Sequence, residues 1–125
     1  YGFVISIFLS RAMRGEPLIV YGDGTQTRDF TYISDVVDAN LLAIKKKTRG
    51  EIFNIGFGNE VSINVLASKV SKITNKNLDI IYVDPVQGEI KRRWADITKA
   101  REHLAYNPKI ALDDGLKMTF EGASG

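Results

Sequence analysis

Apolar side chains recur every three or four residues over residues 4–13, and this spacing predicts an amphipathic helix. Gly15 and Pro17 interrupt the pattern and end the helix. The next four residues, 18–21, are apolar or aromatic and include β-branched side chains, which favours a strand. Residues 22–24 read Gly-Asp-Gly, a turn signal. The chain is therefore expected to begin as helix, strand and turn.

A second helix is expected soon after this turn. Ser34 is suited to cap a helix from Asp35 to about Lys47, because its hydroxyl can accept a hydrogen bond from a free N–H group of the first turn. Asp35 and Asp38 would lie at the positive end of the helix dipole, and the lysines at 45–47 at its negative end. The side chains expected on the inner faces of this helix are Val36, Val37, Ala39, Asn40, Leu41 and Ala43.

Shorter elements are expected in the rest of the chain. Residues 51–55 alternate in polarity and predict a short strand, and residues 78–83 are a second strand candidate. Ser62 is expected to cap a helix, and two last helices are expected to begin at Asp96 and near Asp113. This order of elements indicates an α/β fold, or an α+β fragment, with short strands beside several helices and no complete doubly wound sheet.

Composition allows one core and narrows the function classes. With 125 residues and 44% hydrophobic content, the chain can bury about two thirds of its unfolded surface, so residues 1–125 are expected to form a single domain. The 17 basic and 15 acidic side chains give a net charge of +2. This small charge provides no electrostatic argument for binding nucleic acid or a membrane surface. The apolar run at 3–9 is too short to span a bilayer.

The counts of cysteine and histidine exclude further kinds of site. The chain has no cysteine, so disulfides, thiolate metal sites and a cysteine nucleophile are impossible, and this suits the reducing cytoplasm in which we expect the protein. His103 is the single histidine. A histidine-based metal site is therefore not expected.

The most informative segment runs from Tyr21 to Tyr32. Arg28 stands there between the glycine turn and two aromatic residues, Phe30 and Tyr32. A guanidinium offers a planar fork of donors to a phosphate or carboxylate, and an aromatic ring nearby can cover a flat base. These residues suggest a site for a nucleotide diphosphate. The same residues also allow an ordinary hairpin in which Arg28 and Asp29 form a solvated surface pair.

Three segments in the same order resemble the extended short-chain dehydrogenase/reductase family that acts on nucleotide sugars. They are residues 21–39, the Phe-Asn-Ile-Gly at 53–56, and residues 88–100. This family includes UDP-glucose 4-epimerase, dTDP-glucose 4,6-dehydratase and UDP-glucuronate decarboxylase. All three segments are similar to the C-terminal, substrate-binding portion of the family. The resemblance therefore implies that the chain is a fragment, with the Rossmann core and its bound NAD in a missing N-terminal domain.

The catalytic residues of that family are not expected in this chain. Its hydride chemistry uses a tyrosine with a lysine four residues later, and none of the tyrosines meets this requirement. The residues four positions after Tyr1, Tyr21, Tyr32, Tyr82 and Tyr106 are Ile5, Thr25, Val36, Val86 and Ile110. The glycine pairs at 22–24 and 56–58 lack the third glycine of a dinucleotide fingerprint. We therefore assign no catalytic and no cofactor-binding residue here.

The resemblance implies substrate-binding roles for eight residues. Ile19, Val20 and Tyr21 would lie against the base, with Tyr21 stacking on it, although Tyr21 could equally be half-buried core. Arg28 would bind the diphosphate. Asn54 would bind a sugar or phosphate oxygen or, alternatively, cap its own turn. Glu89 would accept from the ribose hydroxyls, and Arg92 or Arg93 would supply a second cation for the diphosphate.

Two further positions bear on this assignment. Many epimerases carry an arginine three residues before the acid, where this chain has Val86, so a second cation has to come from Arg92 or Arg93. Trp94 is expected in the core rather than stacked on a ligand.

The resemblance implies a sequence-based conclusion about function. We expect the substrate-binding part of an NAD-dependent nucleotide-sugar epimerase, similar to UDP-glucose 4-epimerase, in which NAD transiently oxidises C4 of the sugar and returns hydride to the other face. The alternatives are part of a dTDP-glucose 4,6-dehydratase or UDP-glucuronate decarboxylase, or a non-catalytic sugar-nucleotide-binding module. The expected partners are a UDP- or dTDP-sugar, the missing N-terminal domain and, for the intact enzyme, a second copy in a homodimer. The chain alone is expected to be inactive.

Overall fold

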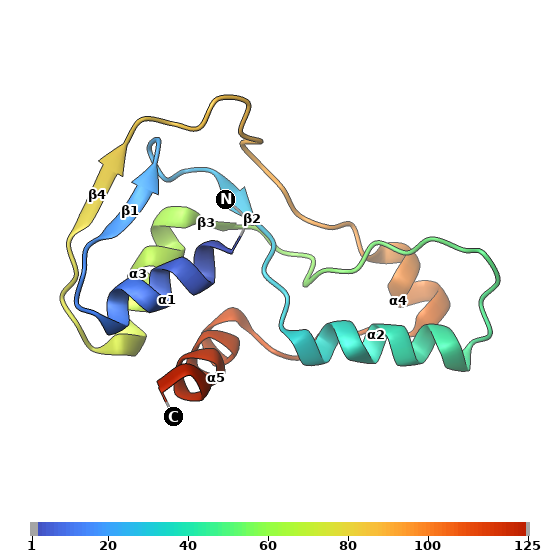
Figure 1. Cartoon of the computed structure of the whole chain (residues 1–125). Coiled ribbons are helices and arrows are strands. Elements are labelled where there is room, and N and C mark those ends of the chain that lie inside the picture. Colours follow the sequence, from blue (N-terminus) through green and yellow to red (C-terminus); the bar gives the residue numbers. More distant parts are fainter. Residues whose placement is uncertain (1–2, 125) are drawn as a thin grey trace.

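The computed structural model describes residues 3–124 and has the helices and short strands of an α/β protein (Figure 1). The helices are α1 (Val4–Met13), α2 (Ile33–Lys45), α3 (Ile63–Thr74), α4 (Thr98–Leu104) and α5 (Leu112–Ser124). The strands are β1 (Leu18–Tyr21), β2 (Thr27–Arg28), β3 (Val61–Ser62) and β4 (Ile80–Val83). The predicted fold class is therefore confirmed, and α1 and β1 have the predicted bounds.

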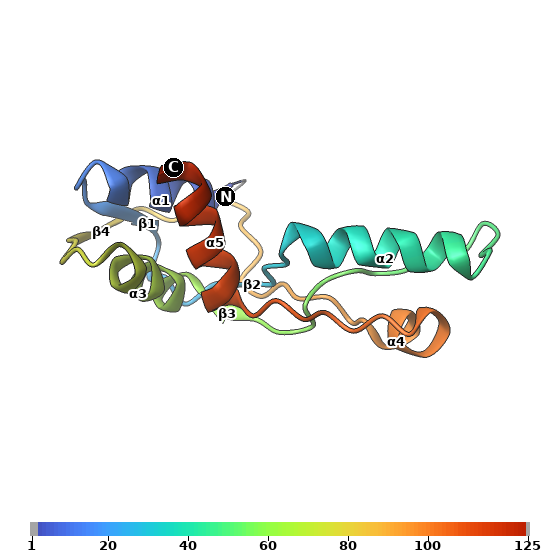
Figure 2. The same cartoon turned by 90° about the horizontal axis from the view of Figure 1, so that it is seen from below.

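The larger group of elements is a two-stranded parallel sheet packed on helices. β1 pairs with β4, with Leu18 opposite Ile80 and Tyr21 opposite Val83. Leu18 and Val20 of β1 are fully buried, whereas Tyr21 is exposed. Figure 2 shows α1, α3 and α5 grouped with this sheet. The buried residues of this core are Val4, Phe8, Leu9, Ala12, Leu18, Val20, Ile63, Leu66, Ala67, Val70 and Leu116.

A second, smaller core lies between α2 and α4, which extend side by side away from the sheet in both views (Figures 1 and 2). Ala39 of α2 packs there with Ala100 and Leu104 of α4, and Ile97 and Tyr106 complete the cluster. A two-stranded antiparallel sheet, β2 with β3, joins the two groups through pairs such as Arg28 with Val61. Arg28 is therefore held on regular backbone at the junction of the two cores.

The start and the inner face of α2 differ from the prediction. The helix begins at Ile33, and its N-cap is Tyr32, without a side-chain capping bond, so the predicted Ser34 cap is wrong. Asp35 lies in the first turn, as predicted, but it is buried: its carboxylate accepts hydrogen bonds from the backbone N–H groups of Lys109 (2.9 Å) and Ile110 (3.0 Å). This long-range contact turns the helix so that Val37, Asn40 and Leu41, predicted to face inward, are exposed.

The strand predicted at residues 51–55 is also wrong. The segment is extended but unassigned, and Ile52 is 82% exposed. A strand requires a neighbouring strand for its hydrogen bonds, and no strand of the part of the chain that the structure describes pairs with it. The local alternation of polarity was therefore insufficient to form an element.

The predicted starts of the helices that depend on local capping are closer to the observed ones. The Ser62 hydroxyl accepts a hydrogen bond from the N–H of Val65 (3.2 Å), which confirms the predicted cap of α3. Asp96 accepts hydrogen bonds from the backbone N–H (3.0 Å) and hydroxyl (2.6 Å) of Thr98, and these bonds lower the pKa of its carboxyl. Thr98 is the first residue of α4, so this helix begins two residues after the start predicted at Asp96.

Candidate nucleotide-sugar site

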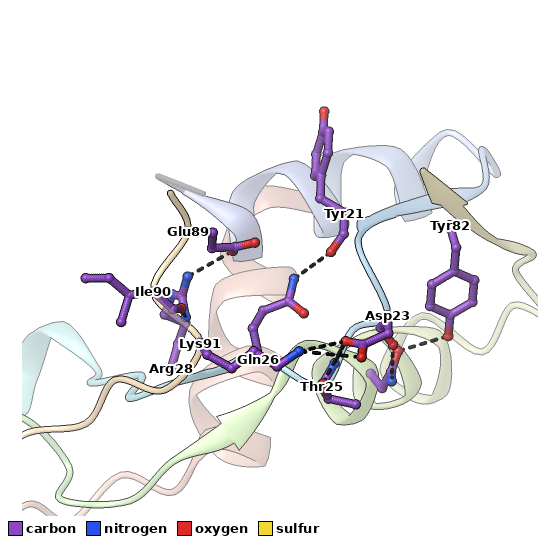
Figure 3. A network of polar contacts seen from close by, with 10 residues as sticks. Tyr21, Asp23, Thr25, Gln26, Arg28, Tyr82, Glu89, Ile90 and Lys91 are labelled. Carbon is purple, nitrogen blue, oxygen red and sulfur yellow. Dashed lines mark hydrogen bonds and ion pairs between the residues drawn. The ribbon is translucent and has the colours of Figure 1, made fainter. Parts of the chain in front are cut away.

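The turn after β1 sets the direction of the segment that carries Arg28 (Figure 3). Gly22 and Gly24 have φ angles of 75° and 76°, in the left-handed region that favours glycine. Asp23 accepts hydrogen bonds from the hydroxyl (2.7 Å) and N–H (2.9 Å) of Thr25. These bonds, with help from Lys91, lower the pKa of Asp23 to about 2. Gln26 donates to the Tyr21 carbonyl at 2.7 Å, so the turn is fixed from inside.

The guanidinium of Arg28 is held in an internal network. Its Nη1 donates to the carbonyls of Thr27 (2.7 Å) and Ile90 (2.8 Å), and its Nη2 donates to Oε1 of Glu89 at 2.9 Å. The side chains of this ion pair are 14% and 13% exposed. Figure 3 shows Glu89 directly facing Arg28. The alternative in which Arg28 pairs with Asp29 as a solvated surface pair is therefore wrong.

Arg28 nevertheless lines a cavity. The cavity has a volume of about 570 Å³, and Arg28 shares its wall with Asn54 and Arg93, two other predicted site residues. Asn54 is exposed and makes no hydrogen bond to its own turn within residues 3–124. Segments far apart in the sequence thus bring two cations and an amide to one hollow. Such groups can bind phosphate or sugar oxygens.

A second cavity, also about 570 Å³, contains the other predicted residues that face outward. Tyr21 and Glu89 line it together with Tyr82 and Lys91. Tyr21 is half-exposed, so it is not a core residue. The ring of Tyr82 on β4 points in the opposite direction to that of Tyr21, and its hydroxyl donates to Oδ1 of Asn64 at 2.9 Å (Figure 3). Aromatic rings with a carboxylate and an ammonium group suit a base with its ribose.

Ile19 and Val20, which were also predicted to lie against the base, are less exposed to solvent than Tyr21. Val20 is fully buried, so its side chain belongs to the core and only its backbone could meet a ligand. Ile19 alternates with it and is half-buried.

Arg92 is directed away from Arg28. Its guanidinium donates to both carboxylate oxygens of Glu60 (2.5 and 3.1 Å) and lies 4.7 Å from the centre of the Trp94 ring. The bond to Arg92 lowers the pKa of Glu60. Trp94 is 48% exposed, so its predicted place in the core is wrong. Trp94 lines the Arg28 cavity and, with Arg93, a third cavity of about 620 Å³.

Asp29 is a residue of the site that the sequence interpretation missed. Its carboxylate accepts hydrogen bonds from the backbone N–H groups of Phe57 (3.1 Å), Gly58 (3.0 Å) and Ala95 (3.1 Å). It thereby ties together the two segments that carry Asn54 and Arg93. A Cβ on Gly56 would lie 2.5 Å from an Asp29 oxygen. The glycine at 56, two positions after Asn54, was the one sequence signal of this close approach.

Neither a metal-binding cluster nor a membrane-spanning helix occurs among residues 3–124. Among residues 3–124 no three His, Cys, Asp or Glu side chains come together as a metal site. No helix in this described range has the length and apolar character needed to cross a membrane.

Comparison with known proteins gives a consistent family. Residues 2–56 match the family model "NAD dependent epimerase/dehydratase family". Over 91% of its length the chain is 43% identical to a putative UDP-glucose 4-epimerase of Methanocaldococcus jannaschii, of which it covers 36%. Over 97% it is 39% identical to a UDP-N-acetyl-alpha-D-glucosaminuronate decarboxylase of Bacillus cytotoxicus, of which it covers 40%.

The fold gives the same result. The crystal structure of UDP-glucose 4-epimerase with UDP-glucose from Thermotoga maritima matches with a TM-score of 0.92 and 40% identity, over 97% of this chain and 39% of that one. The chain therefore spans about 40% of the length of its relatives. Residues 2–56 thus match the NAD dependent epimerase/dehydratase family model, and in sequence and fold the chain is similar to the C-terminal portion of extended short-chain dehydrogenase/reductase enzymes.

Proposed function

We propose that this chain is the substrate-binding portion of an NAD-dependent nucleotide-sugar epimerase that binds the base and diphosphate of a UDP-sugar. One observation carries the proposal: Arg28 stands between two cavities, one lined with a further arginine and an amide, the other with two tyrosines and a carboxylate. A nucleotide sugar has the matching sequence of groups, which is a flat base, a ribose, two phosphates and a sugar.

The residues take the following roles in this proposal. Tyr21 stacks on the base, beside Ile19 and the backbone of Val20. Glu89 accepts from the ribose hydroxyls, and Arg28 binds the diphosphate. Asn54 and Arg93 meet the phosphate or sugar oxygens on the far side of Arg28. Arg93 is a better second cation than Arg92, because Arg92 is paired with Glu60 whereas Arg93 lines the Arg28 cavity.

NAD belongs to the rest of the intact protein in this proposal. The crystal structure of UDP-glucuronic acid 4-epimerase from Bacillus cereus, which is 37% identical to this chain, contains UDP-glucuronic acid and NAD. The glycine pairs of this chain are explained by tight turns, because Gly22, Gly24 and Gly58 have positive φ angles that favour glycine without any bound pyrophosphate. This chain orients the substrate, and the hydride and proton transfers take place on residues outside it.

The exposed surface of α2 supports a missing domain as partner. Ile33, Val37, Leu41 and Ile44 repeat on one side of the helix, and all four are exposed. The unpaired segment 51–55 is also exposed at Ile52. Apolar surface of this extent on a single helix marks an interface. We propose that it packs on the N-terminal Rossmann domain of a cytoplasmic enzyme, which in its intact form is a homodimer.

Calorimetry with UDP and UDP-glucose tests the proposal. The unmodified chain should bind both, and Arg28→Ala should weaken both, because a charge-assisted contact contributes about 1.5 to 3 kcal/mol. Arg14→Ala is the matched control, since Arg14 also pairs with a glutamate but lies on the exposed end of α1. Equal affinities for the two variants would contradict the assignment. With UDP-glucose and NAD the chain alone should show no turnover, and measurable epimerisation would contradict the proposed division of labour.

A second candidate reaction is decarboxylation or dehydration. Two similarities support these reactions as alternatives. The chain is 39% identical to UDP-glucuronic acid decarboxylase 5 of Arabidopsis thaliana and 27% identical to a dTDP-glucose 4,6-dehydratase of known structure. Preference for UDP-glucuronic acid over UDP-glucose would support an acidic-sugar substrate, and preference for dTDP over UDP would support the dehydratase. If none of these ligands binds, a non-catalytic interaction module is the better description.

A further inference from the structure

The ion pair between Arg28 and Glu89 joins the walls of two cavities. Arg28 lines the cavity with Asn54 and Arg93, and Glu89 lines the cavity with Tyr21. The two hollows have about the same volume, 570 Å³. A residue in the wall of one cavity is thus in direct contact with a residue in the wall of the other. This ion pair therefore differs from an ordinary surface ion pair, because its two partners line different cavities.

Three of the five N–H donors of Arg28 are used in this arrangement, and its charge is already paired. Two backbone carbonyls occupy Nη1, and the Glu89 carboxylate neutralises the charge through Nη2 at 2.9 Å. A phosphate that approaches Arg28 also approaches Glu89, and like charges repel. If the phosphate displaces Glu89, a carboxylate that is only 13% exposed loses its cation. Leaving such a group without a partner is unfavourable.

The main chain is open before Glu89 and anchored after it. Gly88 has a φ angle of 80°, and nothing lies within 4 Å of the position that a Cβ would take. Beyond Glu89 the segment is anchored by a backbone bond from Thr27 N–H to the Lys91 carbonyl (2.8 Å) and by the ion pair of Lys91 with Asp23 (3.2 Å). Glu89 thus lies between an open glycine and a fixed anchor.

We propose that Glu89 determines the specificity of this site by competing for Arg28 with any ligand that has an anionic group but no hydroxyl groups for Glu89. A nucleoside diphosphate offers phosphate oxygens to Arg28 and ribose hydroxyls to Glu89, so both charges keep a partner when the ion pair opens. Inorganic pyrophosphate satisfies Arg28 only, and a free nucleoside satisfies Glu89 only. The identity of the natural ligand in this inference rests on the proposed function. The competition between Glu89 and a phosphate for Arg28 does not rest on it.

Binding of inorganic pyrophosphate to Glu89→Gln tests the inference. The amide keeps the shape of the side chain and removes its charge, so pyrophosphate should bind about tenfold tighter than to the unmodified chain, which corresponds to about 1.4 kcal/mol. The ratio of the affinities for UDP and pyrophosphate should fall by at least the same factor. Glu16→Gln, which removes the partner of Arg14, is the matched control and should change neither affinity. Unchanged or weaker pyrophosphate binding to Glu89→Gln overturns the inference.

Two additions keep the outcome clear. Circular dichroism checks that Glu89→Gln is folded, and if it is not, Glu89→Ala takes its place. A second measurement uses the unmodified chain. The guanidinium NMR signals of Arg28 should shift when UDP is added but not when uridine is added. Signals that respond equally to both overturn the inference. Failure of the unmodified chain to bind UDP contradicts the proposed function, whereas the gain in pyrophosphate affinity depends only on Arg28 and Glu89. The two failures are therefore distinguishable.

Discussion

The hydroxyl of Tyr106 donates a hydrogen bond to the backbone carbonyl of Gly56 at 2.7 Å, across 50 residues of sequence. Tyr106 is buried in the smaller core, and Gly56 follows Asn54 by two positions. This bond connects the core between α2 and α4 to the wall of the Arg28 cavity. The position of Asn54 therefore depends on packing that lies outside the site.

Tyr106→Phe should destabilise the chain by about 1 to 3 kcal/mol, because the substitution leaves a carbonyl without its donor while keeping the ring. Urea unfolding followed by circular dichroism measures this change. Tyr82→Phe is the matched control, since its hydroxyl bonds to Asn64 at an exposed position, and it should cost less than about 0.5 kcal/mol. Equal effects of the two substitutions would contradict the role given to Tyr106.

Stability should also depend on pH through Tyr106. Burial, with the nearby carboxylates of Asp35 and Asp29, raises the pKa of Tyr106 to about 12, whereas the unfolded chain has the ordinary value of about 10. The folded state therefore holds this proton more firmly. Its stabilising contribution is complete below pH 10 and is lost as the pH rises from about 10 to 12. The difference in unfolding free energy between the unmodified chain and Tyr106→Phe should shrink over this interval, and a constant difference would refute the shift.

Asp29→Asn should destabilise the chain by about 2 to 4 kcal/mol. The carboxylate accepts from three backbone N–H groups, and an amide presents donors of its own to some of them. Asp113→Asn is a control of the same chemistry at an exposed ion pair with Lys69, where about 0 to 1 kcal/mol is expected. Hydrogen exchange should accelerate at residues 57, 58 and 95 in Asp29→Asn. Protection that persists there would show that the carboxylate is not what holds these segments.

Two glycine substitutions should have opposite signs. Gly56→Ala places a Cβ at 2.5 Å from Asp29 and 2.6 Å from the Ala95 Cβ, so we expect a loss of about 1 to 3 kcal/mol. Gly122 lies in α5 with open space around it, so Gly122→Ala should stabilise by up to about 1 kcal/mol. Thermal unfolding measures both changes. A neutral Gly56→Ala would mean that the Asn54 and Arg93 segments can separate freely.

The sequence predicted those parts of the fold that depend on local interactions. Periodicity with Gly15 and Pro17 gave the bounds of α1, and Ser62 caps α3 as expected. Residues 51–55 failed because a strand needs a partner strand, which local alternation cannot supply. Asp35 was placed at a helix terminus by its position, yet its carboxylate bonds to residues more than 70 positions away.

The site was predictable in its residues more than in its contacts. Arg28, Asn54 and Arg93 do share one cavity, and Tyr21 and Glu89 share the next. The binding roles of these residues remain predictions. The contact between Glu89 and Arg28 could not be predicted, because the two residues are 61 positions apart in the sequence. Trp94 was misplaced because large aromatics are usually buried, and its contact with Arg92 depends on the fold.

The most direct measurement of the central claim is a cycle of four affinities, UDP and uridine each with the unmodified chain and with Arg28→Ala. If Arg28 binds the diphosphate, UDP should lose about ten- to a hundredfold in affinity on substitution, while uridine, which has no phosphate, should change little. A loss of the same size for both ligands, or for neither, would contradict the account.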